Sequence, residues 1–316
     1  MRCHSQSPDD EKAPKLRLEL RMIYRSFLFA PGDSDRKIEK AIATNADAII
    51  LDLEDAVVAE NRPTARTMVR NVLQNIGPTM PGRLWVRVNP VCTDDCLSDL
   101  AAITCDGLAG VMVPKPDSAA DIDTVSAYLA ALERKEGLAS GTVKILSVMT
   151  ETGKGFLNAA SYGNAERPRL SGVLWGAEDL SAALGASANT DEDGALSFTY
   201  QMARSLCLAA ASAGEIQAID TVYTDFKNPD GLRANSLAAR REGFLGKIAI
   251  HPNQVDIINE CFSPSAADIA HAKAVIAAFA ENPGKGTVGL NGKMLDRPHQ
   301  VQAERVLSLA EAFNIQ

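Results

Sequence analysis

Charged and polar side chains stand directly after short apolar runs throughout this sequence of 316 residues. The run ILSVMT, for example, is followed at once by Glu151. A carboxylate at the mouth of a buried strand is costly to desolvate, so its presence needs a chemical explanation. Several carboxylates that converge repel one another and raise their pKa values unless a cation lies between them. The groups that end or follow the apolar runs are Asp33, Glu54, Asp55, Arg87, Asn89, Lys115, Glu151, Glu178, Asp179, Asp220 and His251.

The segment after Glu151 reads TGKGF and suggests a second explanation, a phosphate-binding loop. That motif needs a glycine five positions before the glycine of its Gly-Lys pair, and Ser or Thr after the lysine. Val148 and Gly155 occupy those two places. The phosphate-loop interpretation therefore fails, and the carboxylate of Glu151 is itself the group to explain.

The elements that position these groups follow from the alternation of eight apolar runs with amphipathic segments. Strands that alternate with helices form βαβ units and a parallel sheet. Eight near-continuous apolar strands in roughly 225 residues favour an α/β fold, a closed (β/α)8 TIM barrel, whose active site lies at the carboxyl ends of the strands. An open doubly wound sheet is the alternative, although the first turn, PGDSDRK, lacks its glycine-rich motif. The expected strands cover 26–30, 48–53, 84–88, 110–114, 144–149, 172–176, 218–223 and 247–251.

Three regions are expected along the chain. Residues 1–22 mix both charge signs without an apolar signal core, and we interpret them as a loose extension. Residues 23–281 are expected to form the barrel. Residues 282–316 contain a loop rich in Gly, Pro and Lys, followed by a last helical stretch. Because this tail follows the eighth strand, the barrel does not need it for closure.

A divalent metal would resolve the repulsion among the carboxylates. Neighbouring strands lie about 4.8 Å apart, so Glu151 after the fifth strand and Asp179 after the sixth are placed to share one ion. Glu178 and Asp179 are adjacent and point to different sides if the strand is still extended there, and we assign the metal to Asp179. Mg²⁺ suits a site with one or two carboxylates, waters and substrate oxygens. A Schiff base on Lys115 is the metal-free alternative.

Composition excludes several classes of protein. The net charge of −8 argues against a non-specific nucleic-acid or membrane-surface binder, and the longest apolar runs are strand-sized. Six scattered cysteines suggest reduced thiols in the cytoplasm rather than a disulfide framework. Cys92 and Cys96 have no further Cys pair or His nearby for a zinc site. We interpret His251 as a structural residue or as one that contacts ligand through its backbone. We interpret Asp220 as a residue near a strand end whose carboxylate is paired within the protein and takes no part in catalysis.

The motifs together resemble the family of the citrate lyase β subunit and the malyl-CoA and citramalyl-CoA lyases, within the HpcH/HpaI aldolase superfamily. The resemblance covers about residues 24–314. It implies a TIM barrel with a C-terminal lid, assembled as a homotrimer or hexamer. It also implies magnesium-dependent cleavage or formation of a C–C bond between an acetyl-CoA-type enolate and a 2-oxo acid. The motifs that carry it are RSFLFAPGDSDRKIEKA, DAIILDLEDAV, LWVRVNP, GVMVPK, TETGKG, WGAEDLSAALG, GFLGKIAIHPNQ and GLNGKMLDRPH.

Carried over by position, the resemblance assigns roles to individual residues. Glu151 and Asp179 become the metal ligands, and Arg87 faces the reacting carbonyl oxygen. Asp296 matches an acid that reaches the site from the neighbouring subunit's lid and handles a proton. The further assignments are Glu54 and Asp55 as groups that orient metal waters or arginines, and Arg25, Arg36, Lys37, Glu178 and the backbone of Ile250 and His251 as substrate or CoA contacts.

The reaction that the resemblance implies is a retro-Claisen cleavage of a 3-hydroxyacyl-CoA of the citramalyl-CoA type into acetyl-CoA and a 2-oxo acid. Malyl-CoA lyase and the β subunit of a citrate lyase complex, which cleaves a citryl thioester, are the alternatives within the family. Two further alternatives are a metal-dependent aldolase that acts on free 2-oxo acids and a barrel without catalytic activity. Malyl, citramalyl and citryl groups differ only at the hydroxyl-bearing carbon, which the sequence does not resolve.

Overall fold

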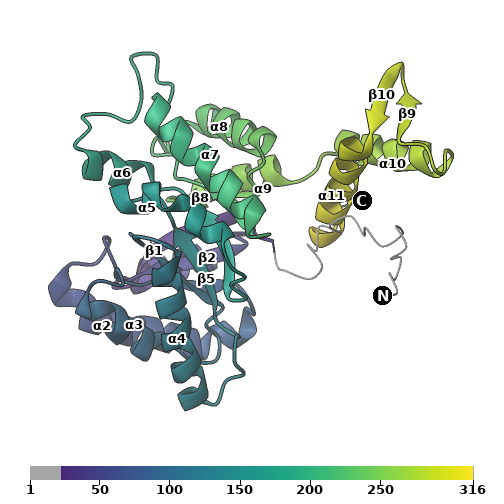
Figure 1. The fold of residues 1–316 in the computed structure, drawn as a ribbon. Coiled ribbons are helices and arrows are strands. Elements are labelled where there is room, and N and C mark those ends of the chain that lie inside the picture. The colour runs from purple at the N-terminus through teal and green to yellow at the C-terminus, as the bar shows by residue number, and fades with distance from the viewer. Residues whose placement is uncertain (1–22, 316) are drawn as a thin grey trace, which may run out of the picture.

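Eight parallel strands form a closed barrel in the computed structural model, which describes residues 23–315 (Figure 1). β1 pairs with both β2 and β8, which closes the sheet. The predicted TIM barrel is confirmed, and the extension predicted for residues 1–22 lies outside the described residues. The barrel strands are β1 (Ser26–Pro31), β2 (Ala48–Asp52), β3 (Leu84–Arg87), β4 (Gly110–Val113), β5 (Lys144–Val148), β6 (Leu170–Leu174), β7 (Gln217–Asp220) and β8 (Gly246–Ala249).

Helices follow the strands and cover the outside of the barrel. Each apolar helix face packs on the strands, as the sequence pattern predicts. The helices are α1 (Asp35–Ile42), α2 (Arg62–Asn75), α3 (Asp94–Ile103), α4 (Ala119–Glu136), α5 (Gly153–Leu157), α6 (Ala177–Leu184), α7 (Phe198–Ala213), α8 (Pro229–Glu242) and α9 (Val255–Phe262). Short 3₁₀ turns occupy Ala59–Asn61, Gly77–Thr79, Ala159–Gly163 and Pro252–Gln254.

The inside of the barrel is a separate apolar core built from alternate residues of the strands. Trp85 is its largest side chain and packs edge-on against Tyr24 and Phe27. A Cβ on Gly110 would lie 2.2 Å from the indole ring of Trp85, so only glycine leaves room for this ring inside the barrel. The interior is therefore filled, and chemistry is confined to the rim.

A buried ion pair ties β7 and β8 to α7. Lys247 Nζ donates to Asp220 Oδ2 at 2.6 Å, and the indole N–H of Trp175 donates to Asp220 Oδ1 at 2.8 Å. Arg204 on α7 lies 3.7 Å from the same carboxylate. Asp220 is thus satisfied within the wall, as the sequence interpretation expected, and is not available to a substrate.

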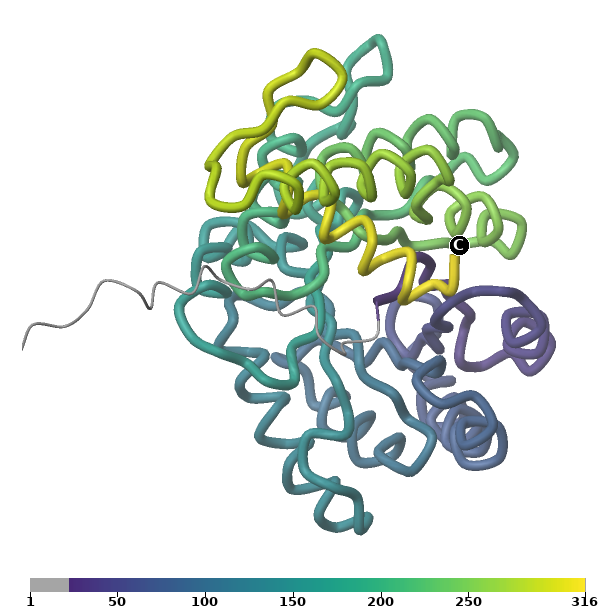
Figure 2. The backbone as a smooth tube through the Cα atoms, turned by 90° about the vertical axis from the view of Figure 1, so that its right-hand side faces the viewer, coloured from purple at the N-terminus to yellow at the C-terminus, as the bar shows by residue number. Residues whose placement is uncertain are grey.

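The last elements form an arm that leaves the barrel at the amino ends of its strands. The arm comprises α10 (Ala266–Ala280), the hairpin β9 (Thr287–Leu290) and β10 (Lys293–Asp296), and α11 (Arg297–Ala312). It has its own small apolar core, and the hairpin projects away from α5 and α6 (Figure 1). Figure 2 shows α11 crossing in front of the ring of barrel helices. Among the described residues, no helix is long and apolar enough to span a membrane.

Candidate active site at the carboxyl ends of the strands

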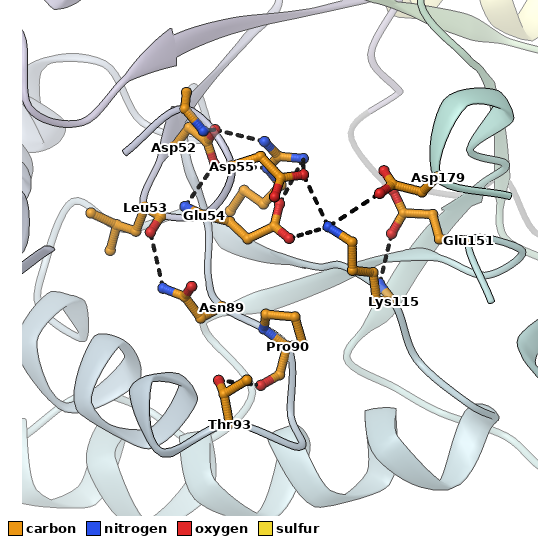
Figure 3. Close-up of polar contacts among 12 residues, drawn as sticks. Asp52, Leu53, Glu54, Asp55, Asn89, Pro90, Thr93, Lys115, Glu151 and Asp179 are labelled. Carbon is orange, nitrogen blue, oxygen red and sulfur yellow. Dashed lines mark hydrogen bonds and ion pairs between the residues drawn. The ribbon is translucent and has the colours of Figure 1, made fainter. Parts of the chain in front are cut away.

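Five acidic side chains gather at the carboxyl ends of β2, β5 and β6, with two basic side chains among them (Figure 3). This placement brings together five of the twelve site residues predicted from the sequence, Glu54, Asp55, Arg87, Glu151 and Asp179. The carboxylates, which we call the acidic rim, are Asp52, Glu54, Asp55, Glu151 and Asp179, and the cations are Arg87 and Lys115.

Glu151 lies two residues beyond the last buried apolar residue after β5 and is itself buried. Its Oε2 accepts the backbone N–H of Lys115 at 2.6 Å. A Cβ on Gly176 would lie 2.5 Å from Cγ of Glu151, so glycine is required there for the carboxylate to occupy its place. Burial, followed by the negative charge of Asp179, raises the pKa of Glu151 well above its usual range. Such a carboxylate is ready to accept a cation.

Asp179 reaches the rim from the first turn of α6, so the chain is no longer extended at this point. Gly176 is the N-cap, so the chain turns helical before Glu178 and Asp179. Side chains that are adjacent on a helix point about 100° apart, and the two acids still separate. Asp179 lies 3.4 Å from Lys115 Nζ. Glu178 instead accepts a hydrogen bond from Asn189 at 3.1 Å, and we leave it out of the proposed site.

Arg87 is held rigidly at the end of β3. Its Nε and Nη2 donate to the two oxygens of Asp52 at 2.7 and 2.6 Å, and Nη1 lies 3.0 Å from Glu54 Oε2. The guanidinium also stacks over the ring of Phe29, 4.8 Å from its centroid. The hydrogen bond and charge of Asp52 outweigh burial and raise the pKa of Arg87, so its positive charge is permanent.

Asp52 belongs to the candidate site but is not among the residues predicted from the sequence. It lies within the run AIILDL, where it reads as part of a strand. Its buried carboxylate accepts the backbone N–H groups of Glu54 and Ala56, both at 3.0 Å, in addition to the bonds from Arg87. One side chain therefore orients both the arginine and the loop that carries Glu54 and Asp55. The pairing of Asp52 with Arg87 on neighbouring strands is visible only once the register is known.

The ammonium of Lys115 lies between the two sides of the acidic rim (Figure 3). It forms a short contact with Glu54 Oε1, lies 2.9 Å from Asp55 Oδ2 and extends toward Asp179. Although burial favours the neutral amine, hydrogen bonds to Glu54 and Asp55 raise the pKa of Lys115. A protonated lysine is not a nucleophile, so these contacts argue against the Schiff-base alternative.

The two acids that follow β2 differ in environment. Burial raises the pKa of the Glu54 carboxyl group despite its contacts with Arg87 and Lys115. Burial acts in the same direction on Asp55, but the hydrogen bond from Lys115 outweighs it and lowers the pKa of Asp55. Asp55 is also the more exposed of the two, and it is therefore ionised at neutral pH.

The residues present fit a hard divalent cation. If all are ionised, the five carboxylates of the acidic rim exceed the two cations by three charges. Glu151 and Asp179 interact electrostatically, and Asp179 is one-third exposed at 32%, which leaves room for waters or substrate oxygens. Among the described residues, no group of three or more His, Cys, Asp or Glu side chains is arranged so that it could hold a metal ion. Two carboxylates with further coordination from water and substrate suit Mg²⁺.

A groove of about 510 Å³ lies between the segments that follow β7 and β8, at the same end of the barrel as the acidic rim. Phe226 and His251 stack across it with ring centroids 5.0 Å apart, and Lys227 contributes a positive charge. The backbone N–H groups of Ile250 and His251 both donate to Gln254, at 2.8 and 3.2 Å. The His251 ring accepts the backbone N–H of Asn253, which fits a structural role.

The basic residues predicted near the start of the chain separate into two groups. Arg36 and Lys37 are exposed in the first turn of α1, after the carboxyl end of β1. Arg25 precedes β1 and lies at the opposite end of the barrel. Its guanidinium is bound by Asp47 at 2.7 Å and Ser263 at 3.0 Å. The structure therefore does not bring Arg25 to the rim of its own barrel, because a residue before a strand lies at the strand's amino end.

Asp296 is also remote from the rim of its own chain. It ends β10 and caps α11, where its carboxylate pairs with His299 at 2.5 Å. The arm departs after Ser263 and returns with Phe313, and both residues contact Arg25 at the amino end of the barrel. Within one chain, Asp296 therefore does not cover the acidic rim.

A pH dependence of stability follows from the raised pKa of Glu151. In metal-free protein, the Glu151 carboxyl group has a higher pKa in the folded state than in the unfolded state. Its contribution to the free energy of unfolding is therefore complete below the unfolded pKa and is lost as the pH rises through the folded pKa. Glu151→Gln cannot ionise, and its amide oxygen can still accept the Lys115 N–H. We expect the variant to match wild type near pH 4 and to be more stable by about 1–2 kcal/mol at pH 7. Urea unfolding in EDTA between pH 4 and pH 7 measures the difference in free energy of unfolding. A variant that is no more stable than wild type at pH 7 would contradict the raised pKa of Glu151.

Comparisons with known proteins agree with this geometry. Residues 25–252 match the sequence profile of HpcH/HpaI aldolase/citrate lyase. The chain is 38% identical over 292 residues to (3S)-malyl-CoA thioesterase of Cereibacter sphaeroides, covering 92% of this chain and 95% of the relative. It is 34% identical to citrate lyase subunit beta of Haemophilus influenzae, covering 92% and 98%.

A solved structure is similar over nearly the whole length. The crystal structure of CitE from Mycobacterium tuberculosis in complex with magnesium, acetoacetate and coenzyme A superposes with a TM-score of 0.76 and 34% identity. The alignment covers 92% of this chain and 100% of that one.

Proposed function

Because the chain belongs to the HpcH/HpaI aldolase/citrate lyase family, we propose that it is a magnesium-dependent C–C lyase that acts on a CoA thioester. The proposed substrate is a 3-hydroxyacyl-CoA of the citramalyl type, which is cleaved to acetyl-CoA and a 2-oxo acid. The observation that carries the proposal is the placement of the Glu151 and Asp179 carboxylates side by side in one acidic rim (Figure 3), together with the guanidinium of Arg87 that Asp52 holds in place. Magnesium and CoA in the complex of the related CitE support the same ligands here.

Each residue of the rim has a defined part in this reaction. Glu151 and Asp179 would hold the cation, which would acidify the substrate hydroxyl. When that hydroxyl gives its proton to a water molecule at the open rim, the C–C bond breaks, the alkoxide becomes the carbonyl of the 2-oxo acid, and the electron pair of the broken bond passes to the acetyl-CoA enolate. Arg87 stabilises the developing negative oxygen, and it needs no reorganisation because Asp52 and Phe29 already fix it. Glu54 and Asp55 orient waters around the cation.

The enolate carbon must then receive a proton. Asp296 is the proposed donor, and it must come from another copy of the chain because its own arm lies at the opposite end of the barrel. We therefore propose a homotrimer or hexamer in which each arm covers a neighbour's acidic rim as a lid. Arg36, Lys37 and the groove at Phe226 and His251 are the proposed contacts for the CoA phosphates and base. The scattered free cysteines support a cytoplasmic location.

A second candidate function is hydrolysis of the thioester, which the relative named (3S)-malyl-CoA thioesterase favours. The same cation and arginine could position a thioester carbonyl for attack by water. Hydrolysis would release free CoA and the intact hydroxy acid, whereas the lyase reaction leaves the thioester bond in place. The products therefore distinguish the two functions.

A panel of three thioesters tests the proposal. Purified chain is incubated with malyl-CoA, citramalyl-CoA or citryl-CoA, with Mg²⁺ or EDTA, and acetyl-CoA, free CoA and 2-oxo acid are measured by liquid chromatography. We expect acetyl-CoA and 2-oxo acid in equal amounts from citramalyl-CoA, and only with Mg²⁺. Free CoA without a 2-oxo acid would establish the thioesterase. Absence of turnover on every CoA thioester, with turnover of a citryl group on an acyl-carrier protein, would indicate a citrate lyase β subunit.

A further inference from the structure

We propose that Lys115 is the resident counter-ion of the acidic rim, and that a divalent cation displaces its ammonium group from Asp179 when it binds. The inference rests on the proposed metal site and adds a residue to it. Lys115 would act as a positioning residue, since it contacts the acids that surround the reaction rather than the reacting atoms. In the absence of metal its ammonium would hold the two sides of the rim together.

The contacts of Lys115 reach every acid beside the proposed metal position. Its Nζ bridges Glu54 and Asp55 on the loop after β2 and lies 3.4 Å from Asp179 on α6. Its backbone N–H donates to Glu151 at 2.6 Å. One residue is thus attached to both proposed metal ligands, through the main chain to Glu151 and through the side chain to Asp179.

The backbone conformation of Lys115 explains how its main chain can contact Glu151 while its side chain reaches Glu54, Asp55 and Asp179. Its φ angle is +51°, in the left-handed region that residues with a side chain rarely adopt. This conformation, directly after Pro114 at the end of β4, directs the N–H toward β5 while the side chain crosses the rim toward β2 (Figure 3). The surrounding contacts with Glu54, Asp55 and Glu151 hold the unusual conformation in place.

The distances from the Lys115 ammonium indicate which of its contacts a bound cation would break. Asp179 lies farther from the ammonium than Asp55 does, at 3.4 Å against 2.9 Å, and Asp179 is the acid shared with the metal. A divalent ion on Asp179 repels an ammonium a few ångströms away. The lysine would then remain on Glu54 and Asp55 and leave Asp179 to the metal. Metal binding therefore works against the positive charge of Lys115.

This competition gives Lys115→Met two effects of opposite sign. Without metal, the rim loses a counter-ion, and the melting temperature measured in EDTA should fall. With metal, the competing charge is gone, and the Mg²⁺ dissociation constant measured by calorimetry should fall by about tenfold or more. A lysine with only a structural role would weaken both properties, because a poorly formed site also binds metal poorly.

The experiment titrates MgCl₂ into EDTA-treated, dialysed protein for wild type, Lys115→Met, Lys115→Arg and Lys154→Met. Lys115→Arg keeps the charge and should stay within about threefold of the wild-type dissociation constant. Lys154 is the matched control, since it lies three residues after Glu151 but pairs with Asp117, at 2.9 Å, outside the rim. Its variant should bind Mg²⁺ as wild type does.

The two proposals fail in different ways. If wild type binds Mg²⁺ and Lys115→Met binds it equally or more weakly, the counter-ion role of Lys115 is overturned while the metal site stands. If neither protein binds Mg²⁺, the proposed function loses its cation and the role of Lys115 falls with it.

Discussion

Replacing Asp179 by alanine is expected to lower kcat by at least ~10³-fold while the fold survives. The variant leaves one carboxylate, Glu151, to hold the cation, and a Lewis acid contributes several kcal/mol to such a reaction, where each factor of ten corresponds to about 1.4 kcal/mol. Asp179 is one-third exposed at 32% and stands in the first turn of a helix, so its loss should disturb packing little. Acetyl-CoA release in saturating Mg²⁺ measures the activity, and circular dichroism checks the fold.

Glu178→Ala is the matched control for this prediction. Glu178 precedes Asp179 in the same helical turn, but it is exposed and accepts a hydrogen bond from Asn189. Its variant should keep activity within a few-fold of wild type. Normal turnover by Asp179→Ala, or equal losses in the two variants, would contradict the assignment of Asp179 to the metal.

Replacing Arg87 by methionine is expected to have the second largest effect, a loss of roughly 10²–10³-fold in kcat. The guanidinium is fixed by Asp52, Glu54 and Phe29, so it acts as positive charge in place before the oxyanion forms. Lysine should not restore activity, because it cannot reproduce the two parallel bonds to Asp52. Steady-state kinetics on the thioester found active in the panel measure the loss.

The control for Arg87 lies at the other end of the same strand. Arg83 precedes β3 and donates to the backbone carbonyls of Thr44 and Ala46, at 3.0 and 2.8 Å, far from the rim. Arg83→Met should therefore leave kcat within about twofold of wild type once the folded fraction is accounted for. A variant at Arg87 that retains wild-type kcat would remove the guanidinium from the mechanism.

The barrel could be predicted from the sequence because strands buried on both faces leave a strong signal. Each of the eight apolar runs corresponds to one strand, and the carboxyl ends of parallel strands must meet at one rim. The cost of burying a carboxylate singled out Glu151 for the same reason. Its neighbour in space, Asp179, followed from the order of the strands, although the local geometry was a helix rather than an extended chain.

The remaining features depend on contacts that a one-dimensional pattern does not contain. Asp52 looks like a strand residue, and its role emerges only from the register of β2 against β3. The bridging role of Lys115 requires a left-handed backbone, which the sequence gives no reason to expect of a lysine. Arg25 stands directly before β1, and the start of a strand lies at the far end of the barrel, so the predicted contact of Arg25 with substrate is not made within its own chain.

The arm shows a further limit of sequence reasoning. The sequence predicts a barrel that extends to residue 281, followed by a loop and a helix. In the structure α10 packs with the arm rather than the barrel, and the loop contains the hairpin of β9 and β10. The place where an arm leaves the barrel depends on the end at which α9 terminates. Since α9 returns to the amino end of β1, a lid on its own rim is ruled out by geometry. Only a second copy of the chain could then supply Asp296.

The most direct test is the location of a divalent cation in crystals of the protein grown with Mn²⁺, which scatters anomalously where Mg²⁺ does not. We predict one strong anomalous peak within coordinating distance of both the Glu151 and the Asp179 carboxylates. A map with no peak between these two side chains, or with its strongest peak elsewhere, would contradict the proposed metal site and the C–C cleavage that depends on it.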